Sequence, residues 1–451
     1  MEKSRFLKEM KPKMTSGPIA KTILRFAAPV FVAQLLQQLY NIADTIIVGR
    51  YLGVDAVAAV GATWSLNYII GSFCIGTCMG INVPLSQAYG ADDGKRLRCY
   101  FAHGVYLSLV LAVLLTITTT SLSRPVLELL RTPGKILDDS VTYIFIIFLG
   151  LPFTILYNFC FGVLMAFGDS KKSSMFMALS TVLNLLLDLL MIVEWNWGVA
   201  GAAVSTVISQ GIAGGASLWY ILIKYKIIYP KRCEWKFRAV YMKSIVRMCV
   251  PMGLQYSVTA IGAIILQFSV NGIGKEAVAS YSIGSKIKGF LLSPLNALGT
   301  TVATFVGQNF GAGQTGRIKE GVKKSLYMGI GYAFIAIVFI FFAGENIVGL
   351  FISQDNTLVI HQAQKFILYI SVFQIELAVL FIFRYSVQGM GYGKYSIYSG
   401  LAEMAGRSVM AILIVPLWGF DAVCWSEGVT FLAGILVILP VYYVLVKEMK
   451  K

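Results

Sequence analysis

Charged residues are scarce in this chain. Only 13% of its 451 residues are Asp, Glu, Lys or Arg, whereas 57% are hydrophobic. Soluble domains use charged side chains for about a quarter of their residues, because their surfaces face water. The composition therefore excludes a soluble globular protein and indicates a polytopic membrane protein.

Residue patterns typical of enzymes and metal sites are also missing. The chain has two histidines, His103 and His361, and no Walker loop, zinc-ligand pattern or nucleophile elbow. The seven cysteines form no convincing metal site and are interpreted as reduced packing residues. The sequence thus gives no support to an enzyme and predicts no cofactor and no metal beyond a transported Na⁺.

The chain contains many long apolar segments. Twelve apolar runs each reach roughly the 20 residues that a helix needs to cross a bilayer. The runs lie near 27–49, 56–84, 101–122, 141–164, 175–193, 199–223, 249–271, 277–304, 325–343, 360–388, 396–418 and 421–446. They predict an all-α integral membrane protein with twelve transmembrane helices.

The second half of the chain is a diverged copy of the first. The stretch 87–91 reappears at 308–312, and Gly198 and Ser205 are answered by Gly419 and Ser426, always at the same offset along the chain. Six spans per copy predict two parallel six-helix bundles, related by a pseudo-twofold axis along the membrane normal. The predicted parts are an N-terminal lobe at 1–223, a cytoplasmic connector at 224–248 that could hold an interfacial helix, and a C-terminal lobe at 249–451.

The positive charge has a regular placement. The net charge is +16, and basic residues gather on alternate loops, as the positive-inside rule describes. This pattern predicts a multi-pass protein of the plasma membrane with both termini in the cytoplasm, and no binding of nucleic acid. The basic clusters are Lys3, Arg5, Lys8, Lys11 and Lys13; Lys95, Arg96 and Arg98; Lys171 and Lys172; Lys224 to Arg247; Arg317 to Lys324; and Lys447, Lys450 and Lys451.

Two acids lie inside spans of the first half. Asp44 is on span one and Asp188 is on span five, and the interior of these six spans has no basic residue to neutralise them. An unpaired carboxylate inside a membrane takes a proton or binds a cation. The pair therefore predicts a coupling site for H⁺ or Na⁺.

Polar neighbours surround these two positions. Asn184 shares a helix face with Asp188, and Thr206 and Ser209 form a polar face on span six. Gln34, Gln37 and Asn41 make one stripe with Asp44 at helical spacing. These side chains could supply oxygens to Na⁺ or hydrogen bonds to a proton site, and they could equally be polar packing contacts between helices.

The second half carries charges of both signs within its spans. Three acids and three bases suggest ion pairs, which are either architectural or part of a substrate site. Glu403 and Arg407 lie one turn apart, and Glu376 and Arg384 lie two turns apart. The set is Lys286, Glu376, Arg384, Glu403, Arg407 and Glu427. Uncharged residues that could line a substrate cavity are Tyr40, Tyr68, Tyr157, Gln255, Tyr256 and Tyr281; aromatic walls suit flat cationic guests, although packing or lipid contact explains such residues as well.

Several short motifs, in order along nearly the whole chain, resemble the multidrug and toxic compound extrusion (MATE) family. They are Pro29; Tyr40, Asn41 and Asp44 with Gly49 and Gly53; Ser86, Gln87, Gly90 and Ala91; Gly168 and Asp169; Asn184 and Asp188; Gly198, Gly201, Thr206, Ser209 and Gln210; and Gln308, Asn309, Gly311 and Ala312. The resemblance implies two six-helix lobes around a central cavity. It also implies export of organic cations against an inward flow of H⁺ or Na⁺. The expected partners are a small organic substrate, the coupling ion and membrane lipid, and the chain is expected to be a monomer.

The resemblance also implies where the ion binds. In one branch of the family an Asp on helix one, an Asn and an Asp on helix five and a Thr on helix six form the site, and they match Asp44, Asn184, Asp188 and Thr206. Another branch places acids on helices seven and ten, but here helix seven has no acid and Glu376 is a loose counterpart. A flippase for a lipid-linked precursor and an integral-membrane enzyme are the alternative functions.

Overall fold

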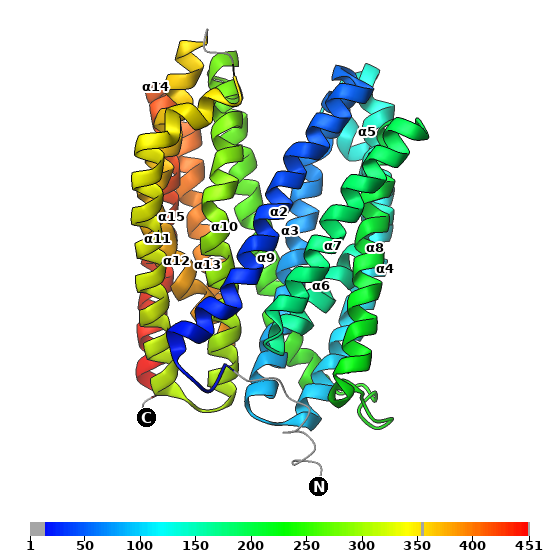
Figure 1. Ribbon diagram of the computed structural model, residues 1–451, viewed down its shortest axis with the longest axis vertical. Coiled ribbons are helices and arrows are strands. Elements are labelled where there is room, and N and C mark those ends of the chain that lie inside the picture. The colour runs from blue at the N-terminus through cyan, green and yellow to red at the C-terminus, as the bar shows by residue number, and fades with distance from the viewer. Residues whose placement is uncertain (1–13, 353–355, 450–451) are drawn as a thin grey trace. The chain divides into compact units, whose positions relative to one another are not determined.

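A computed structural model describes residues 14–352 and 356–449, and all its regular elements there are helices (Figure 1). The first-half elements are α2 Ile19–Leu52, α3 Val54–Gly90, α4 Gly94–Leu129, α5 Gly134–Leu149, α6 Leu151–Ala166, α7 Ser170–Asp188, η1 Leu189–Glu194, α8 Gly198–Lys224 and η2 Lys226–Ile228. The second-half elements are α9 Ala239–Asn271, α10 Lys275–Gly311, α11 Thr315–Gly349, α12 Thr357–Gly389, α13 Lys394–Val409, η3 Met410–Ile414, α14 Val415–Trp418 and α15 Phe420–Glu448. The all-α prediction is confirmed.

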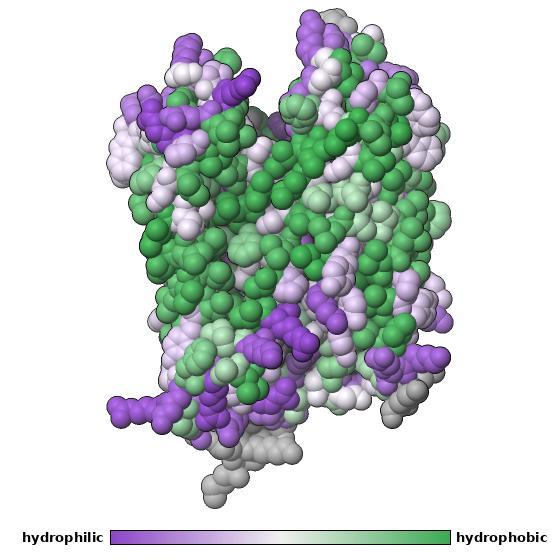
Figure 2. All heavy atoms as spheres, turned by 180° about the vertical axis from the view of Figure 1, so that it is seen from behind, coloured by the Kyte–Doolittle hydropathy of each residue, from purple (hydrophilic) through white to green (hydrophobic). Residues whose placement is uncertain are grey.

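The helices are long and apolar enough to cross a membrane. Eleven candidate spans occur among the described residues, or twelve when α5 and α6, which meet at a 46° bend, count as one. The bend falls at Gly150, followed by Pro152, which cannot donate the helical hydrogen bond of its position. Figure 2 shows apolar side chains over the middle of the helices and hydrophilic ones mainly toward the ends.

The repeat seen in the sequence reappears in the helix bounds. Helix α3 at Val54–Gly90 corresponds to α10 at Lys275–Gly311, with the offset of the sequence repeat at both ends. The π-helical segments η1 and η3 begin at the same offset, and each interrupts a span. Gly198 is the first residue of α8 and Gly419 directly precedes α15; both have positive φ angles, 60° and 58°, at which a side chain would be strained. Both copies therefore build their last span in the same way.

The connector has no α-helix between Tyr225 and Arg238. It contains the single 3₁₀ turn η2 and irregular turns, and α9 begins at Ala239. Its one acid, Glu234, is buried and accepts hydrogen bonds from the Arg98 guanidinium at 2.8 and 2.9 Å. Burial raises the pKa of Glu234, but the Arg98 and Lys231 contacts outweigh burial, so this pKa lies below its usual value. The Arg98–Glu234 ion pair thus holds the connector against α4.

Two helices divide their length between compact units. Among the described residues, one unit consists of 32–253, and the other of 14–31 together with the chain from 254 onward. Helix α2 therefore packs with the second unit up to Phe31 and with the first from Val32 onward. Helix α9 packs with the first unit up to Gly253 and with the second from Leu254 onward. The predicted boundaries placed all of α2 in the lobe at 1–223, and they divided α9 between the connector at 224–248 and the lobe at 249–451.

Each unit has its own apolar core. In the first unit, Gly80 lets α3 and α9 approach closely, because an added Cβ would lie 2.5 Å from the Cys249 Cα. A smaller cluster that includes Ile47, Ile192 and Ala202 packs where α2, η1 and α8 meet. This cluster borders the two predicted acids and fixes the helices that carry them.

Candidate functional site

Asp188 lies at the point where α7 gives way to the π-helical segment η1. Its side chain is fully buried, and one carboxylate oxygen accepts a hydrogen bond from the Ser205 hydroxyl. The Asn184 amide nitrogen donates to Ser205 Oγ at 3.1 Å and to Asp188 Oδ2 at 3.4 Å. A π-helical turn often marks a functional position, because it shifts the side chains of one helix face by a residue.

Asp44 on α2 meets this cluster from the other side. Its carboxyl group lies within hydrogen-bonding reach of that of Asp188, a geometry in which two carboxyl groups can share one proton. Thr206 on α8 donates to Asn184 Oδ1 at 3.4 Å and also interacts with the Tyr40 hydroxyl. The structure therefore brings together all four residues of the predicted coupling site.

Asp44 and Asp188 have no cationic partner in the part of the chain that the structure describes. Within 14–352 and 356–449, no Lys, Arg or His forms an ion pair with Asp44 or Asp188. The same part of the chain holds no group of three His, Cys, Asp or Glu residues that could ligate a metal ion. What the cluster offers is carboxylate, amide and hydroxyl oxygen, the ligand type of hard monovalent cations and of a shared proton.

The residues predicted to support the acids divide into two groups. Gln34 is half-buried, and its Oε1 lacks a hydrogen-bond partner. Ser209 is buried and donates to the Thr206 carbonyl at 2.9 Å. Gln37 and Asn41 are exposed on α2. The sequence thus identified one polar stripe, but only part of it faces the protein interior.

The aromatic candidates do not share one environment. Tyr68 is exposed and stacks on Trp64, with ring centroids 5.0 Å apart. Tyr281 is buried against Phe366, and Tyr256 shares a hydrogen bond of 3.0 Å with the Tyr385 hydroxyl. Tyr157 is half-buried on α6. Tyr281 is therefore a core residue, whereas Tyr68 remains accessible.

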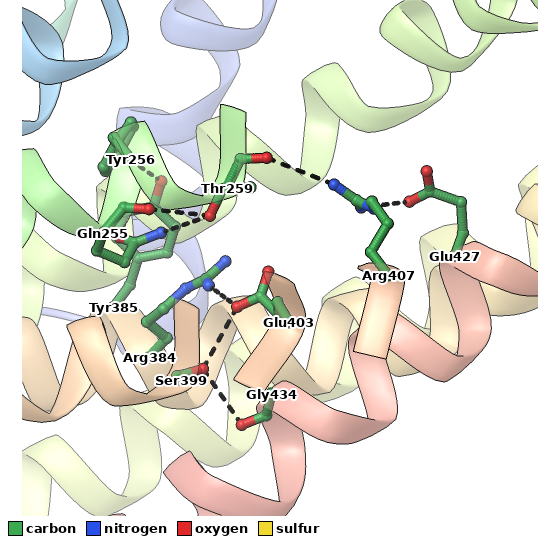
Figure 3. A network of polar contacts seen from close by, with 10 residues as sticks. All are labelled: Gln255, Tyr256, Thr259, Arg384, Tyr385, Ser399, Glu403, Arg407, Glu427 and Gly434. Atoms are coloured by element: carbon green, nitrogen blue, oxygen red, sulfur yellow. Dashed lines mark hydrogen bonds and ion pairs between the residues drawn. The ribbon is translucent and has the colours of Figure 1, made fainter. Parts of the chain in front are cut away.

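The charges of the second unit form ion pairs between helices (Figure 3). Arg384 on α12 pairs with Glu403 on α13. Arg407 on α13 pairs with Glu427 on α15 at 3.0 Å, and Lys288 on α10 reaches the other oxygen of Glu427 at 2.6 Å. The sequence suggested pairs along single helices, at spacings of one or two turns. These pairs instead join different helices, because each charged side chain points into the bundle.

Two further members of that predicted network lie apart. Lys286 is exposed, two residues before Lys288 and on another helix face. Glu376 is half-buried, and its Oε2 is enclosed without a hydrogen-bond partner. Gln255 is buried near Arg384 and donates to Thr259 Oγ1 at 3.3 Å.

Sequence reasoning missed two residues at the coupling site. Ser205, which bonds directly to Asp188, was noticed only as a marker of the repeat. Tyr143 on α5 lies within electrostatic range of both Asp44 and Asp188. A helical wheel of α8 could have drawn attention to Ser205, since it lies one turn before Ser209, but no sequence signal ties α5 to this place.

The repeat shows how differently the two units use one position. Residue 206 of the first copy corresponds to residue 427 of the second, so Thr206 is answered by Glu427. In the first unit, Asp44 and Asp188 form no ion pair with a basic residue of 14–352 or 356–449. In the second, Arg407 and Lys288 neutralise the acid.

Comparison with known proteins identifies the family. The family model MatE matches residues 29–190 and 251–413. The chain belongs to the MatE family. Probable multidrug resistance protein YpnP of Bacillus subtilis (strain 168) is 30% identical over 380 residues, 84% of each chain. Multidrug export protein MepA of Staphylococcus aureus (strain MSSA476) is 24% identical over 432 residues, 94% of each chain.

The fold agrees with this assignment. A multidrug resistance MATE family transporter of the MOP superfamily, solved in an outward-facing conformation, superposes with a TM-score of 0.90 at 20% identity, over 97% of this chain and 98% of that one. The MatE protein described here is therefore a multi-pass membrane transporter and not an enzyme. Its family needs no cofactor and implies small organic substrates.

Proposed function

We propose that this MatE protein is a cation-coupled antiporter of the plasma membrane that exports organic, cationic amphiphilic compounds by alternating access. The single observation that carries the proposal is the closeness of Asp44 and Asp188 within the membrane-spanning helices, where no basic residue of 14–352 or 356–449 forms an ion pair with either acid. Such a pair is costly in a membrane unless it serves an ion, so it is a functional site by default.

The chemistry of the pair suits an exchangeable ion. When a proton bridges the carboxyl groups, or when Na⁺ takes its place, the local negative charge falls and Asn184, Ser205 and Thr206 can complete the shell. When the ion leaves, two like charges face each other and the helices that carry them are driven apart. Asp44 and Asp188 lie on different helices, so ion binding and release would change how α2 packs against α7 and α8.

The flippase alternative has less support. A carrier of lipid-linked phosphates needs several unpaired positive charges, but Arg384 pairs with Glu403, and Glu427 contacts both Lys288 and Arg407, which leaves one surplus positive charge in that cluster. The two relatives reported above are also named for multidrug resistance and export.

The proposal is tested by transport in proteoliposomes with a fluorescent organic cation. A pH gradient and a Na⁺ gradient are imposed separately, with empty liposomes as the control. We expect one of the two gradients to drive accumulation against the substrate's own gradient. Accumulation that follows neither gradient, or translocation of a fluorescent lipid-linked phosphate instead, would rule the proposal out.

The direction of export rests on the orientation of the chain, which labelling can test. Single cysteines at Lys95 and Lys236 should react with an impermeant thiol reagent from the cytoplasmic side only, because basic loops stay inside. Cysteines at Lys135 and Lys275 should react from outside. All four side chains are exposed, and a Cys233→Ser background removes the one exposed native cysteine among the described residues. The reverse labelling pattern would invert the proposed direction.

A further inference from the structure

The segment just before α2 is held by three side chains from far along the chain. The Met14 amide donates to Gln308 Oε1 at 2.9 Å, and Asn309 Nδ2 donates to the Met14 carbonyl at 3.3 Å. The Arg317 guanidinium donates to the carbonyls of Met14, Ser16 and Gly17 at 2.8 to 3.2 Å. We call Gln308, Asn309 and Arg317 the α2 clamp.

Two of the three clamp residues lie in the protein interior, and Arg317 is half-buried at its edge. Gln308 and Asn309 are fully buried, and Met14 is 2% exposed. The Arg317 guanidinium also lies 5.6 Å from the centroid of the Phe305 ring. A planar guanidinium can serve several carbonyls at once through its fixed fork of donors, which an ammonium group cannot do. All these contacts lie within one compact unit.

The other copy holds the equivalent segment with unrelated side chains. Trp235 and Arg238, just before α9, are the repeat counterparts of Met14 and Gly17. The Tyr106 hydroxyl donates to the Trp235 carbonyl at 2.7 Å, and the Arg238 amide donates to His103 Nε2 at 2.9 Å. Because different residues achieve the same result at the same place, fixing the start of these helices is a repeated feature of the fold.

The two helices that follow are those that divide between units. Helix α2 packs with the clamp's own unit as far as Phe31 and with the other unit from Val32. Its second part carries Asp44. One continuous helix therefore joins a fixed end in one unit to the proposed coupling site in the other.

We propose that Gln308, Asn309 and Arg317 are positioning residues for ion coupling. This proposal rests on the proposed function as a cation-coupled antiporter. These residues fix the start of α2. A movement of α2 caused by ion binding or release at Asp44 is therefore transmitted along the helix to the second unit. Without the clamp, the start of α2 moves relative to its own unit and the movement is not transmitted. The ion still binds and substrate still crosses the membrane, but the two events are no longer coupled.

The test compares Arg317→Ala with Arg96→Ala, the same residue type at the equivalent place in the other copy, where the guanidinium lies over Tyr100. The readout is the substrate gradient that an imposed ion gradient sustains, measured beside downhill substrate movement. We expect Arg317→Ala to lose the ion-driven gradient, by about tenfold for one ion and a tenfold ion gradient, and to keep downhill transport. Arg96→Ala should keep both, and Arg317→Lys should resemble Arg317→Ala because it lacks the fork.

A double-cysteine variant allows loss and recovery of ion coupling to be measured in the same protein. Ser16→Cys with Arg317→Cys, in the Cys233→Ser background, should be uncoupled when reduced and coupled again when a bifunctional thiol reagent of arginine length joins the two positions. Hydrogen exchange of the Met14 amide in wild-type protein should stay slow with and without the coupling ion, since the clamp holds throughout the cycle. This measurement does not require the variants to fold.

Asp44→Asn separates the two proposals. If Arg317→Ala keeps full ion-driven transport while Asp44→Asn loses it, the clamp proposal is wrong and the proposed function stands. If Asp44→Asn keeps it as well, the proposed function itself fails. Exchange of the Met14 amide that becomes fast on ion binding would also overturn the clamp.

Discussion

Asparagine in place of Asp44 or of Asp188 will abolish ion-driven efflux in a protein that still folds. The substitution keeps the shape of the side chain and, at 188, the ability to accept the hydrogen bond from Ser205, but it removes the charge and the exchangeable proton. One coupled ion and a tenfold ion gradient support about a tenfold substrate gradient, so the variants should lose about that factor of accumulation. Proteoliposome transport measures it.

The matched control is the same substitution at an exposed acid. Asp138 is 84% exposed and pairs with Arg124 at 3.3 Å, so Asp138→Asn should transport like wild-type protein. Size-exclusion chromatography establishes that each variant is folded. Near wild-type accumulation by both well-folded aspartate variants would remove this pair from the mechanism and direct attention to Glu376, whose enclosed Oε2 has no hydrogen-bond partner.

Loss of Glu427 will destabilise the protein more than loss of either cation that binds it. Glu427 is 1% exposed, and both Lys288 and Arg407 contact it. Glu427→Gln leaves the buried Arg407 and the half-buried Lys288 without their shared acid, which should cost about 3–5 kcal/mol of stability. Arg407→Met leaves the neutral Lys288–Glu427 pair and should cost less. Thermal unfolding in detergent, followed by fluorescence-detected chromatography, gives the order.

Two comparisons make this prediction specific. Adding Lys288→Met to Glu427→Gln should recover part of the lost stability, because the partners are coupled. Asp421→Asn removes the partner of Lys365 from a pair whose members are 60% and 33% exposed, and it should cost at most about 1 kcal/mol. Additive losses in the double variant, or an equal loss from Asp421→Asn, would contradict a buried charge cluster.

The Arg384–Glu403 pair has the same asymmetry between its members. Both side chains are buried. A buried guanidinium cannot lose its proton, whereas a buried carboxylate that loses its partner can take one up. The pair thus follows the same principle as the Glu427 cluster: the acid is the member that the fold needs more.

The sequence by itself determined the class, the spans and the repeat. Scarce charge and runs of about 20 apolar residues are sufficient evidence for a membrane bundle, since a bilayer imposes length and composition on each helix. The constant offset between the copies, read from short motifs, recurs in the bounds of α3 and α10. Asp44 and Asp188 could be singled out because a charge within a span is costly wherever the helix packs.

Only the tertiary structure decided which faces meet. Helical periodicity tells which residues share a face, but the neighbour of that face depends on packing between segments distant in the chain. So Ser205 was found beside Asp188, Arg384 was found with Glu403 and Lys288 with Glu427, and Arg317 was found at the start of α2. The division of α2 and α9 between units has the same origin, because a continuous apolar helix carries no mark of where its contacts change from one bundle to the other.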